Sequence, residues 1–390
     1  MSNPTPKRNT RVLNVGVVGL GRIGRQHALN ALRSRAPTKL ICVFTPAPED
    51  IEWAKEWLIP HGVTIHQSLP EMLDHPGLEG VIIASLTKAH AEQVKMCIER
   101  GKHVLCEKPL AMSSTEVCGM RQIRATNHLA EATEQIRSIL PCAQQHPDIV
   151  VMTAYTRRFD ASYQRALAAI RAGAIGAPQV VRSQTCDMYD RSPFYLRYAS
   201  TSPGVFIDTS IHDVDLTLSF FGADAKPRVL WATGIGAQHP ELAKVHDYDH
   251  AVGVVEWYPD AAKGLPKRVA YFFASRAMKH GFDNSTEVIG TEGMLKINLT
   301  PRKDLLEVAD KGGIRHELVD DFYGRYEHAF VTELEVWAEC VLHGRELPYT
   351  LGTALKGMQI VEALQESLRT GEKIEFDESG RRLREPKSRL

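Results

Sequence analysis

Three glycines near the start of the chain form the first group of residues whose spacing can do chemistry. The segment Gly19-Leu20-Gly21-Arg22-Ile23-Gly24 follows a run rich in valine and precedes a stretch with helical spacing. In that setting the first glycine permits a tight turn, the second lets the backbone approach a pyrophosphate, and the third lets helix and strand pack closely. The free N–H groups of the helix start can then bind the phosphates. This segment therefore predicts a dinucleotide site.

A lysine beside a proline is the second such feature. Lys108 and Pro109 follow the apolar run 103–106. Ligands of parallel sheets bind at the carboxyl ends of the strands, so we expect Lys108 to point at the same crevice. Pro109 restricts the backbone of Lys108 to extended conformations. Without its place at a strand end, Lys108 would be interpreted as a surface residue beside a turn.

Asp208 and His212 form the third feature. They are four residues apart, so on a helix they share a face, and Ile211 and Val214 supply an apolar side. A carboxylate beside a histidine can hold one imidazole tautomer and raise its pKa, which suits a general acid/base pair. The alternative is an N-capping aspartate followed by a core histidine, and these residues alone leave both interpretations open.

The residue that would hold the ribose hydroxyls departs from the usual pattern. Thr45 stands at the end of the second expected strand, where an acidic residue is typical, and Glu49 and Asp50 follow slightly later. We expect no arginine to stand nearby that would attract a 2′-phosphate. The acidic neighbourhood favours NAD, and NADP stays possible.

The elements that position these residues alternate in the first part of the chain. Short apolar runs predict strands at 12–18, 39–44, 63–66, 81–84 and 103–106, and helical periodicity predicts helices at 22–35, 49–58 and 88–100. Such alternation implies βαβ units, and right-handed crossovers make the parallel sheet doubly wound. The first 150 residues therefore predict an α/β nucleotide-type domain.

The order of predicted strands and helices changes near residue 150. A strand at 149–154 and a helix at 160–172 precede successive strands at 228–234, 250–258, 268–275, 286–290 and 294–298. Thr291-Glu292-Gly293 joins the last two as a hairpin turn, and helices at 324–342 and 350–370 close the chain. Strands without intervening helices predict an antiparallel sheet. We expect a flexible tail at 1–10, a dinucleotide-binding domain at 11–150 and a second, α+β domain at 151–390.

Composition limits the possible partners. Among 390 residues, 47 are basic and 47 acidic, and apolar and charged residues make up 43% and 24%. A balanced charge argues against nucleic acid and against an anionic membrane as partners. The apolar runs are too short to span a bilayer. Seven cysteines without a Cys-x-x-Cys pair indicate reduced thiols.

Taken together, these motifs resemble those of the Gfo/Idh/MocA oxidoreductase family. The likeness spans residues 12 to about 370 and includes these segments: Gly19-x-Gly21-x-x-Gly24, Glu107-Lys108-Pro109, 155–160, 175–178, Asp208-x-x-x-His212 and 287–293. The resemblance implies an N-terminal Rossmann domain, with a doubly wound parallel sheet, followed by an α+β domain with a large, open, mostly antiparallel sheet. It also implies that this open sheet packs against another subunit in a homodimer or homotetramer.

The same resemblance implies an NAD(P)-dependent dehydrogenase that acts on a CH–OH group of a cyclic, inositol-like polyol or a sugar. Lys108, Asp208 and His212 would be catalytic, with His212 as the base, Asp208 orienting it and Lys108 stabilising the alkoxide. Arg157 would join these three in contacting the substrate. We expect cofactor contacts from Gly19, Gly21, Arg22, Ile23, Gly24, Thr45, Ser85, Thr87, His90, Glu107 and Lys108.

No metal is expected in this chemistry. His239, His246 and His250 lie close in sequence, but their spacing and the lack of a cysteine do not support zinc, and we interpret them as solvated loop residues.

Two stretches depart from the family pattern. The stretch 113–146 is longer than the family's helix there, and 185–202 matches no one member closely.

Three other functions stay open. The alternatives are a non-catalytic dinucleotide-sensing regulator, a glycosidase that uses NAD for transient oxidation, and a dehydrogenase of a non-sugar alcohol or ketone. The last is suggested by the aromatic residues Tyr189, Phe194, Tyr195 and Tyr198.

The chain ends give an expectation about location. The polar segment 1–11 has no apolar core and does not suit a secretory signal, so we expect a cytoplasmic protein. The C-terminal tripeptide Ser388-Arg389-Leu390 is a variant of the peroxisomal Ser-Lys-Leu address, which would matter in a eukaryote.

Overall fold

The structure is a computed structural model that describes residues 11–111, 139–190, 202–245, 247–260, 264–299, 302–304, 306–319 and 321–383. Its described residues divide into two compact units. The first unit holds 11–111, 139–154 and 330–351, and the second holds 155–329 and 352–383 apart from the gaps. Residues 151–154 and 330–351 thus lie in the first unit, although the sequence analysis placed them in the domain 151–390.

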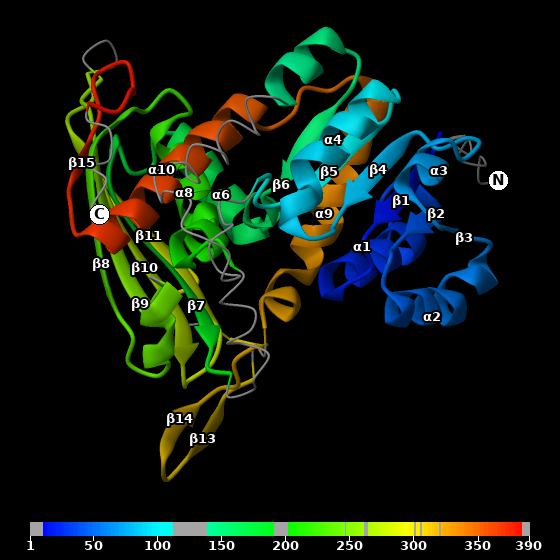
Figure 1. The fold of residues 1–390 in the computed structure, drawn as a ribbon. Helices are drawn as coiled ribbons and strands as arrows, with labels where there is room; N and C mark the ends of the chain where they lie inside the picture. The colour runs from blue at the N-terminus through cyan, green and yellow to red at the C-terminus, as the bar shows by residue number, and fades with distance from the viewer. Residues whose placement is uncertain are drawn as a thin grey trace, which may run out of the picture. The chain divides into compact units, whose positions relative to one another are not determined.

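The first unit is built on a parallel sheet of six strands, in the order β3-β2-β1-β4-β5-β6 (Figure 1). The strands are β1 (Leu13–Val18), β2 (Thr38–Phe44), β3 (Thr64–His66), β4 (Gly80–Ile83), β5 (His103–Glu107) and β6 (Val151–Ala154). Each neighbouring pair is parallel, and the chain switches direction across the sheet between β1 and β4. The expected doubly wound sheet is confirmed, and its switch point lies beside the glycine loop.

Four α-helices connect these strands. They are α1 (Arg22–Arg33), α2 (Pro48–Trp57), α3 (Leu69–Leu73) and α4 (His90–Glu99), with short 3₁₀ turns η1 (Ile59–His61) and η2 (Thr87–Ala89). Pro48 starts α2, where its missing N–H costs nothing. Gly101, with φ of 68°, follows α4 in the left-handed conformation that commonly ends helices. The five-residue α3, capped by Ser68, was not predicted because it is too short to show helical periodicity.

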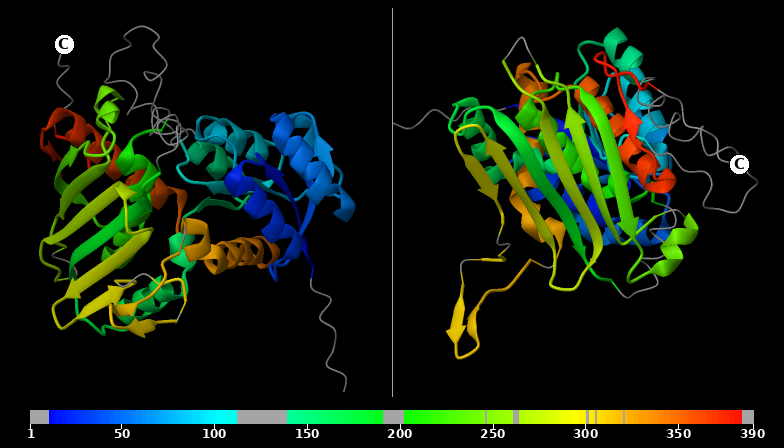
Figure 2. Two further views of the ribbon diagram at one scale, coloured as in Figure 1. Left: turned by 90° about the horizontal axis from the view of Figure 1, so that it is seen from below. Right: turned by 90° about the vertical axis from the view of Figure 1, so that its left-hand side faces the viewer.

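The second unit contains a mixed sheet of seven strands, in the order β12-β11-β7-β10-β9-β8-β15, seen face-on in the right-hand view of Figure 2. Its strands are β7 (Pro178–Met188), β8 (Pro227–Ile235), β9 (His250–Trp257), β10 (Arg268–Met278), β11 (Asp283–Gly290), β12 (Met294–Ile297) and β15 (Ile374–Glu375). Only the β7–β10 pair is parallel. The mostly antiparallel sheet and the 291–293 hairpin are confirmed.

One face of this sheet is less covered than the other. In β9, fully buried residues alternate with partly exposed ones along the whole strand. On the more open face, Trp231 and Tyr271 pair with opposite sides of Val254 and remain 39% and 38% exposed. Alternation of this kind is typical of an antiparallel sheet with one covered face.

The helices of the second unit include α6 (Ala161–Arg171), α8 (Ile211–Phe221) and α10 (Leu351–Thr370). A 3₁₀ turn, η4 (Thr156–Phe159), precedes α6, a π-helical turn, η5 (Phe206–Ser210), precedes α8, and a further 3₁₀ turn, η6 (Pro240–Val245), precedes β9. The small hairpin of β13 (Val308–Asp310) and β14 (Gly313–Arg315) was not predicted. Helix α9 (Phe322–His343) bends at Tyr326, and its residues from Phe330 belong to the first unit.

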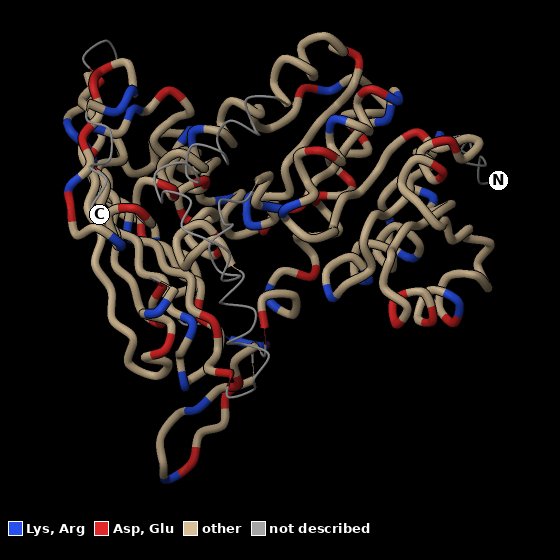
Figure 3. The backbone as a smooth tube through the Cα atoms, viewed as in Figure 1, with Lys and Arg blue, Asp and Glu red and all other residues tan. Residues whose placement is uncertain are grey.

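Charges are mixed in both units. Basic and acidic residues are interspersed along the described chain, as Figure 3 shows. Within the described residues, no helix combines the length and the apolar character that crossing a membrane requires.

Candidate active site

The glycine loop has the geometry that a pyrophosphate site needs. Gly19 has φ of 84°, and a Cβ there would lie 2.6 Å from Cα of Ser85. A Cβ on Gly24 would lie 1.9 Å from the carbonyl oxygen of Gly19, so the start of α1 packs directly on the loop. Gly21 has no atom within 4 Å of its Cβ position, which leaves its backbone open to a ligand. The residues of this loop therefore fit a dinucleotide.

A cavity of about 380 Å³ adjoins this loop in the first unit. Its walls are Gly21, Arg22, Arg25, Gln26, Leu29, Asp50 and Trp53. The cavity thus combines the start of α1 with the acidic first turn of α2.

Asp50 supplies the carboxylate that the end of β2 lacks. Its two oxygens accept hydrogen bonds from Thr45 Oγ1 at 3.2 Å and from Arg25 Nη2 at 2.8 Å. The Arg25 guanidinium also stacks over Trp53, with 5.1 Å to the ring centroid. The expectation that no arginine stands near Thr45 is wrong, because Arg25 reaches this site from α1, a separate segment.

The loops after β4 and β5 are joined by His90. Its ring is buried, with Nδ1 2.9 Å from the carbonyl oxygen of Pro109 and Nε2 3.1 Å from that of Ser85. Burial lowers the pKa of His90. Ser85 in turn donates to Gln93, and Thr87 begins the turn before α4. His90 therefore fixes the two strand-end loops against each other.

Lys108 is supported by Glu107. One Glu107 oxygen lies 2.8 Å from Nε2 of the buried His27, and the other accepts a hydrogen bond from the backbone N–H of Lys108 at 3.2 Å. The His27 ring packs edge-on against Phe330. The peptide bond between Lys108 and Pro109 is cis. His27 was missed in the sequence because its link to Glu107 spans 80 positions.

Asp208 and His212 lie in the second unit, on and after the π-helical turn η5. The expectation of one regular helix over both residues is wrong, since the turn from Phe206 to Ser210 is wider than an α-helix. The His212 ring packs edge-on against Tyr155, with 6.4 Å between centroids. Single π turns of this kind frequently occur at functional sites.

Arg276 holds this turn in place. Its buried guanidinium donates to Asp208 Oδ2 at 3.2 Å and to Asp247 Oδ2 at 2.5 Å. Asp247 also accepts a hydrogen bond from the backbone N–H of Val205, just before the turn. Neither Arg276 nor Asp247 was predicted as a site residue, because each lies on a different strand or loop from Asp208.

Arg157, expected to face the substrate, lies in a buried polar network of the second unit. It donates to Asp213 Oδ1 at 3.0 Å and to Thr185 Oγ1 at 2.8 Å. Asp213 also accepts hydrogen bonds from Ser183 and Thr185. Burial raises the pKa of Asp213, although the Arg157 charge and the two hydroxyls oppose the shift.

Of the histidines expected to be solvated, the two that the structure describes make contacts within the fold, although His250 remains partly exposed. His239 is buried and its ring lies 5.3 Å from that of Tyr189. His250 begins β9 and hydrogen-bonds Ser275 at 3.0 Å. His246, Phe194, Tyr195 and Tyr198 lie outside the described residues, as do most of 113–146 and the C-terminal tripeptide.

Comparison with known protein families shows which family this chain belongs to. The profile described as "Oxidoreductase family, NAD-binding Rossmann fold" matches residues 13–137, and the profile of the Gfo/Idh/MocA C-terminal domain matches 163–296. The chain belongs to the Gfo/Idh/MocA oxidoreductase family. The predicted family, fold class and NAD-dependent dehydrogenase class are confirmed.

Relatives and solved structures agree with this assignment. The scyllo-inositol 2-dehydrogenase (NAD(+)) of Bacillus subtilis is 30% identical over 364 residues, which cover 93% of this chain and 95% of the relative. The myo-inositol 2-dehydrogenase of Thermotoga maritima is 28% identical, over 85% of this chain and 89% of the relative. A crystal structure of scyllo-inositol dehydrogenase from Lactobacillus casei, with NAD(H) and scyllo-inositol, superposes with a TM-score of 0.82 at 28% identity, over 93% and 99% of the two chains.

Proposed function

We propose that this protein oxidises a secondary alcohol of a cyclic polyol of the inositol class, with NAD as the electron acceptor. The proposal rests on one observation: the lysine, the aspartate and the histidine that such a site needs all lie on or next to described secondary-structure elements. Lys108 stands at the carboxyl end of β5, and Asp208 and His212 stand on and after the π-helical turn. The inositol class is inferred from the relatives, which carry dehydrogenase names for scyllo- and myo-inositol.

The first unit contains the groups that would bind the cofactor. The backbone at Gly21 and the start of α1 would bind the pyrophosphate, and Asp50 and Thr45 would bind the ribose hydroxyls. Ser85, Thr87 and Glu107 would complete the wall at the ends of β4 and β5. Bound NAD supplies the acceptor for the hydride of the alcohol carbon.

The chemistry at the alcohol oxygen is done by three side chains. His212 takes the hydroxyl proton as general base, and Asp208 orients the ring and stabilises its charged form. The Lys108 ammonium donates a hydrogen bond to the same oxygen and stabilises the negative charge as it develops. In the reverse direction, Lys108 polarises the ketone and His212 returns the proton.

Five other residues act as positioning residues in this proposal. Glu107 and His27 fix the backbone of Lys108, and His90 fixes the turn at Pro109. Arg276 holds Asp208 from the side of the sheet. Arg157 would support the substrate-binding face through its network with Asp213 and Thr185.

A polyol panel tests the proposed function. We expect reduced nicotinamide to accumulate with at least one inositol isomer when scyllo-inositol, myo-inositol, other cyclic polyols and simple sugars are assayed with NAD and NADP in parallel. Turnover of a glycoside without accumulation of reduced cofactor would indicate the glycosidase alternative. Dinucleotide binding without oxidation of any panel member would contradict the proposal and favour the regulator.

We also propose that the open face of the seven-stranded sheet packs against a second copy of the chain in a homodimer or homotetramer. Its partly exposed Trp231 and Tyr271 support this, since large apolar side chains on an open sheet face are typical of interfaces. A cytoplasmic location, with peroxisomal import conditional on Ser388-Arg389-Leu390, stays a prediction.

A further inference from the structure

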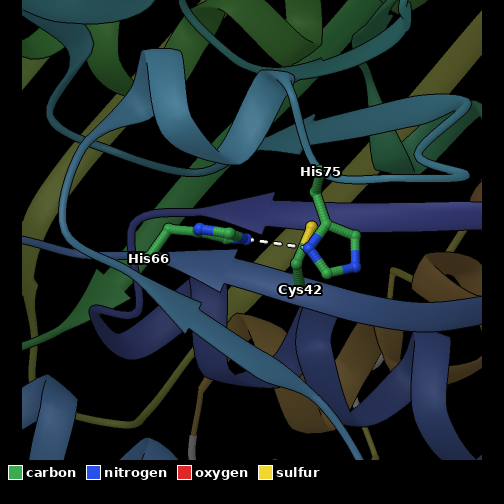
Figure 4. A group of neighbouring side chains, drawn as sticks. All are labelled: Cys42, His66 and His75. Carbon is green, nitrogen blue, oxygen red and sulfur yellow. Dashed lines mark hydrogen bonds between the residues drawn. The ribbon is translucent and has the colours of Figure 1, made fainter.

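Three side chains with nitrogen and sulfur donors converge in the first unit, away from the glycine loop. They are Cys42 on β2, His66 at the end of β3 and His75 after α3 (Figure 4). One donor atom of each lies within 4.8 Å of the other two, and His66 Nε2 is 3.0 Å from His75 Nδ1. These residues come from different elements, so the fold rather than the local sequence brings them together.

The strand register explains the convergence. His66 pairs with Phe44 across β2 and β3, and Cys42 lies two residues before Phe44, on the same face of the sheet. Helix α3, started by Ser68, then turns the chain back so that His75 returns to this face. Three segments of the sheet edge therefore meet at one point.

We propose that Cys42, His66 and His75 bind a zinc ion. Zinc takes thiolate sulfur at about 2.3 Å and imidazole nitrogen at about 2.0–2.1 Å, so neighbouring donors of a tetrahedral site are roughly 3.3–3.7 Å apart. The donors lie within 4.8 Å of one another, with the two histidine nitrogens 3.0 Å apart, so side-chain rotation would be needed to bring all three into this range. A water molecule would complete the fourth position.

Glu71 provides an independent observation in favour of this site. Its carboxylate lies 3.1 Å from His66 Nδ1, which leaves Nε2 directed at His75 and Cys42. A carboxylate on the far nitrogen of a histidine is the usual support for a metal-ligating imidazole.

The surroundings suit a bound metal and give it a path of entry. Cys42 and His66 are buried, whereas His75 is half-buried and opens the cluster to solvent. A metal ion that replaces the proton of the Cys42 thiol would stabilise the thiolate there, with release of that proton to solvent. The ion would join β2, β3 and the segment after α3.

Metal binding by the full-length protein tests the proposal. The protein is stripped with a chelator, titrated with Co²⁺ as a spectroscopic probe, and then challenged with Zn²⁺. We expect one Co²⁺ per chain with a thiolate-to-cobalt charge-transfer band, and we expect Zn²⁺ to displace it. Direct elemental analysis then gives the zinc stoichiometry.

Three variants test whether the cluster binds the metal, and a fourth is the control. C42S should remove the charge-transfer band, and H75Q should weaken binding by more than about 100-fold, while E71Q should weaken it by about 10- to 100-fold. C97S changes a buried cysteine of the same unit outside the cluster and should bind like the wild type. Circular dichroism checks folding, and if C42S fails to fold, H75Q decides, since His75 is half-buried.

Two results would overturn the proposal. One is a wild-type protein that retains no Co²⁺ or Zn²⁺ after desalting, which would leave only a hydrogen-bonded histidine pair. The other is unchanged binding in H75Q together with a retained band in C42S. Because the readout is metal content and a spectrum, it does not depend on the proposed dehydrogenase activity.

Discussion

At the scale of single residues, we propose that Asp50 binds the ribose hydroxyls of the cofactor. It holds Thr45 with one oxygen and Arg25 with the other, at 3.2 and 2.8 Å. The carboxylate favours ribose hydroxyls and repels a 2′-phosphate, and it neutralises an arginine that could otherwise bind one. This arrangement gives a physical reason to expect a preference for NAD over NADP.

Replacement of Asp50 by asparagine should therefore shift cofactor preference. With the charge removed, Arg25 becomes available to a 2′-phosphate, and we expect the ratio of kcat/KM for NADP to that for NAD to rise by about tenfold or more, roughly 1.4 kcal/mol. Steady-state kinetics with both cofactors measure the ratio. Glu49→Gln removes the same charge from the exposed neighbouring position and should leave it unchanged. An unchanged ratio in Asp50→Asn would contradict the role of Asp50.

His212 carries the proton in the proposed mechanism, so its protonation should control the rate. We expect kcat/KM for alcohol oxidation to fall as the pH is lowered, because an imidazolium cannot accept the hydroxyl proton. His212→Ala should lose about 10²- to 10⁴-fold in kcat and lose this acidic limb. A pH profile that stays flat from about pH 5 to 9, with chemistry rate-limiting, would count against His212 as the base.

At the scale of elements, the buried network under Arg157 holds β7 and α8 together. Arg157 spans from Asp213 on α8 to Thr185 on β7, and Ser183 on β7 also donates to Asp213. Loss of the cation leaves the Asp213 carboxylate buried without its partner. Removing one partner of a buried ion pair destabilises a protein more than replacing both partners with apolar residues.

We expect Arg157→Met to lower the free energy of unfolding of the second unit by about 3–5 kcal/mol. Urea denaturation followed by circular dichroism measures the change. Arg302→Met removes an exposed partner of Glu307 in the same unit and should cost less than about 1 kcal/mol. A cost for Arg157→Met as small as that of the control would show that the network contributes little to stability.

Elements with a strong local pattern could be predicted from the sequence. Strands β1, β2, β4 and β5 are short apolar runs buried on both faces, which local composition reveals. Strand β7 was not predicted, because its eleven residues mix partly exposed polar positions with buried ones and lack a clear alternation. Its central place in the sheet depends on pairing with β10 and β11, about a hundred residues away.

The same limit applies to the site. The residues next to a motif, such as Gly19 to Gly24 and Lys108, follow from local spacing. The groups that support them come from distant segments, as His27 does for Glu107 and Arg276 for Asp208. The π-helical turn at 206–210 has no sequence signature, so the spacing of Asp208 and His212 predicted an ordinary helix.

At the scale of the whole molecule, the open sheet face is the feature expected to set the oligomeric state. We expect Tyr271→Glu to place a charge among Trp231 and Val254 and to convert the oligomer to a monomer, because an unpaired charge at an apolar interface is costly. Light scattering coupled to size-exclusion chromatography measures the mass. Ile59→Glu, at an exposed position in η1, should keep the wild-type mass. An unchanged mass for Tyr271→Glu, or a monomeric wild type, would contradict this interface.

The central claim for the whole molecule is that it is a dehydrogenase whose alkoxide is stabilised by Lys108. The most direct test is reduced-nicotinamide formation with NAD and an inositol substrate by Lys108→Ala, measured beside calorimetric binding of NAD. Lys39→Ala, an exposed lysine near the opposite end of the parallel sheet, is the control. We predict that Lys108→Ala still binds NAD and loses about 10²- to 10³-fold in kcat, while Lys39→Ala keeps full turnover. Wild-type turnover in Lys108→Ala would contradict the account.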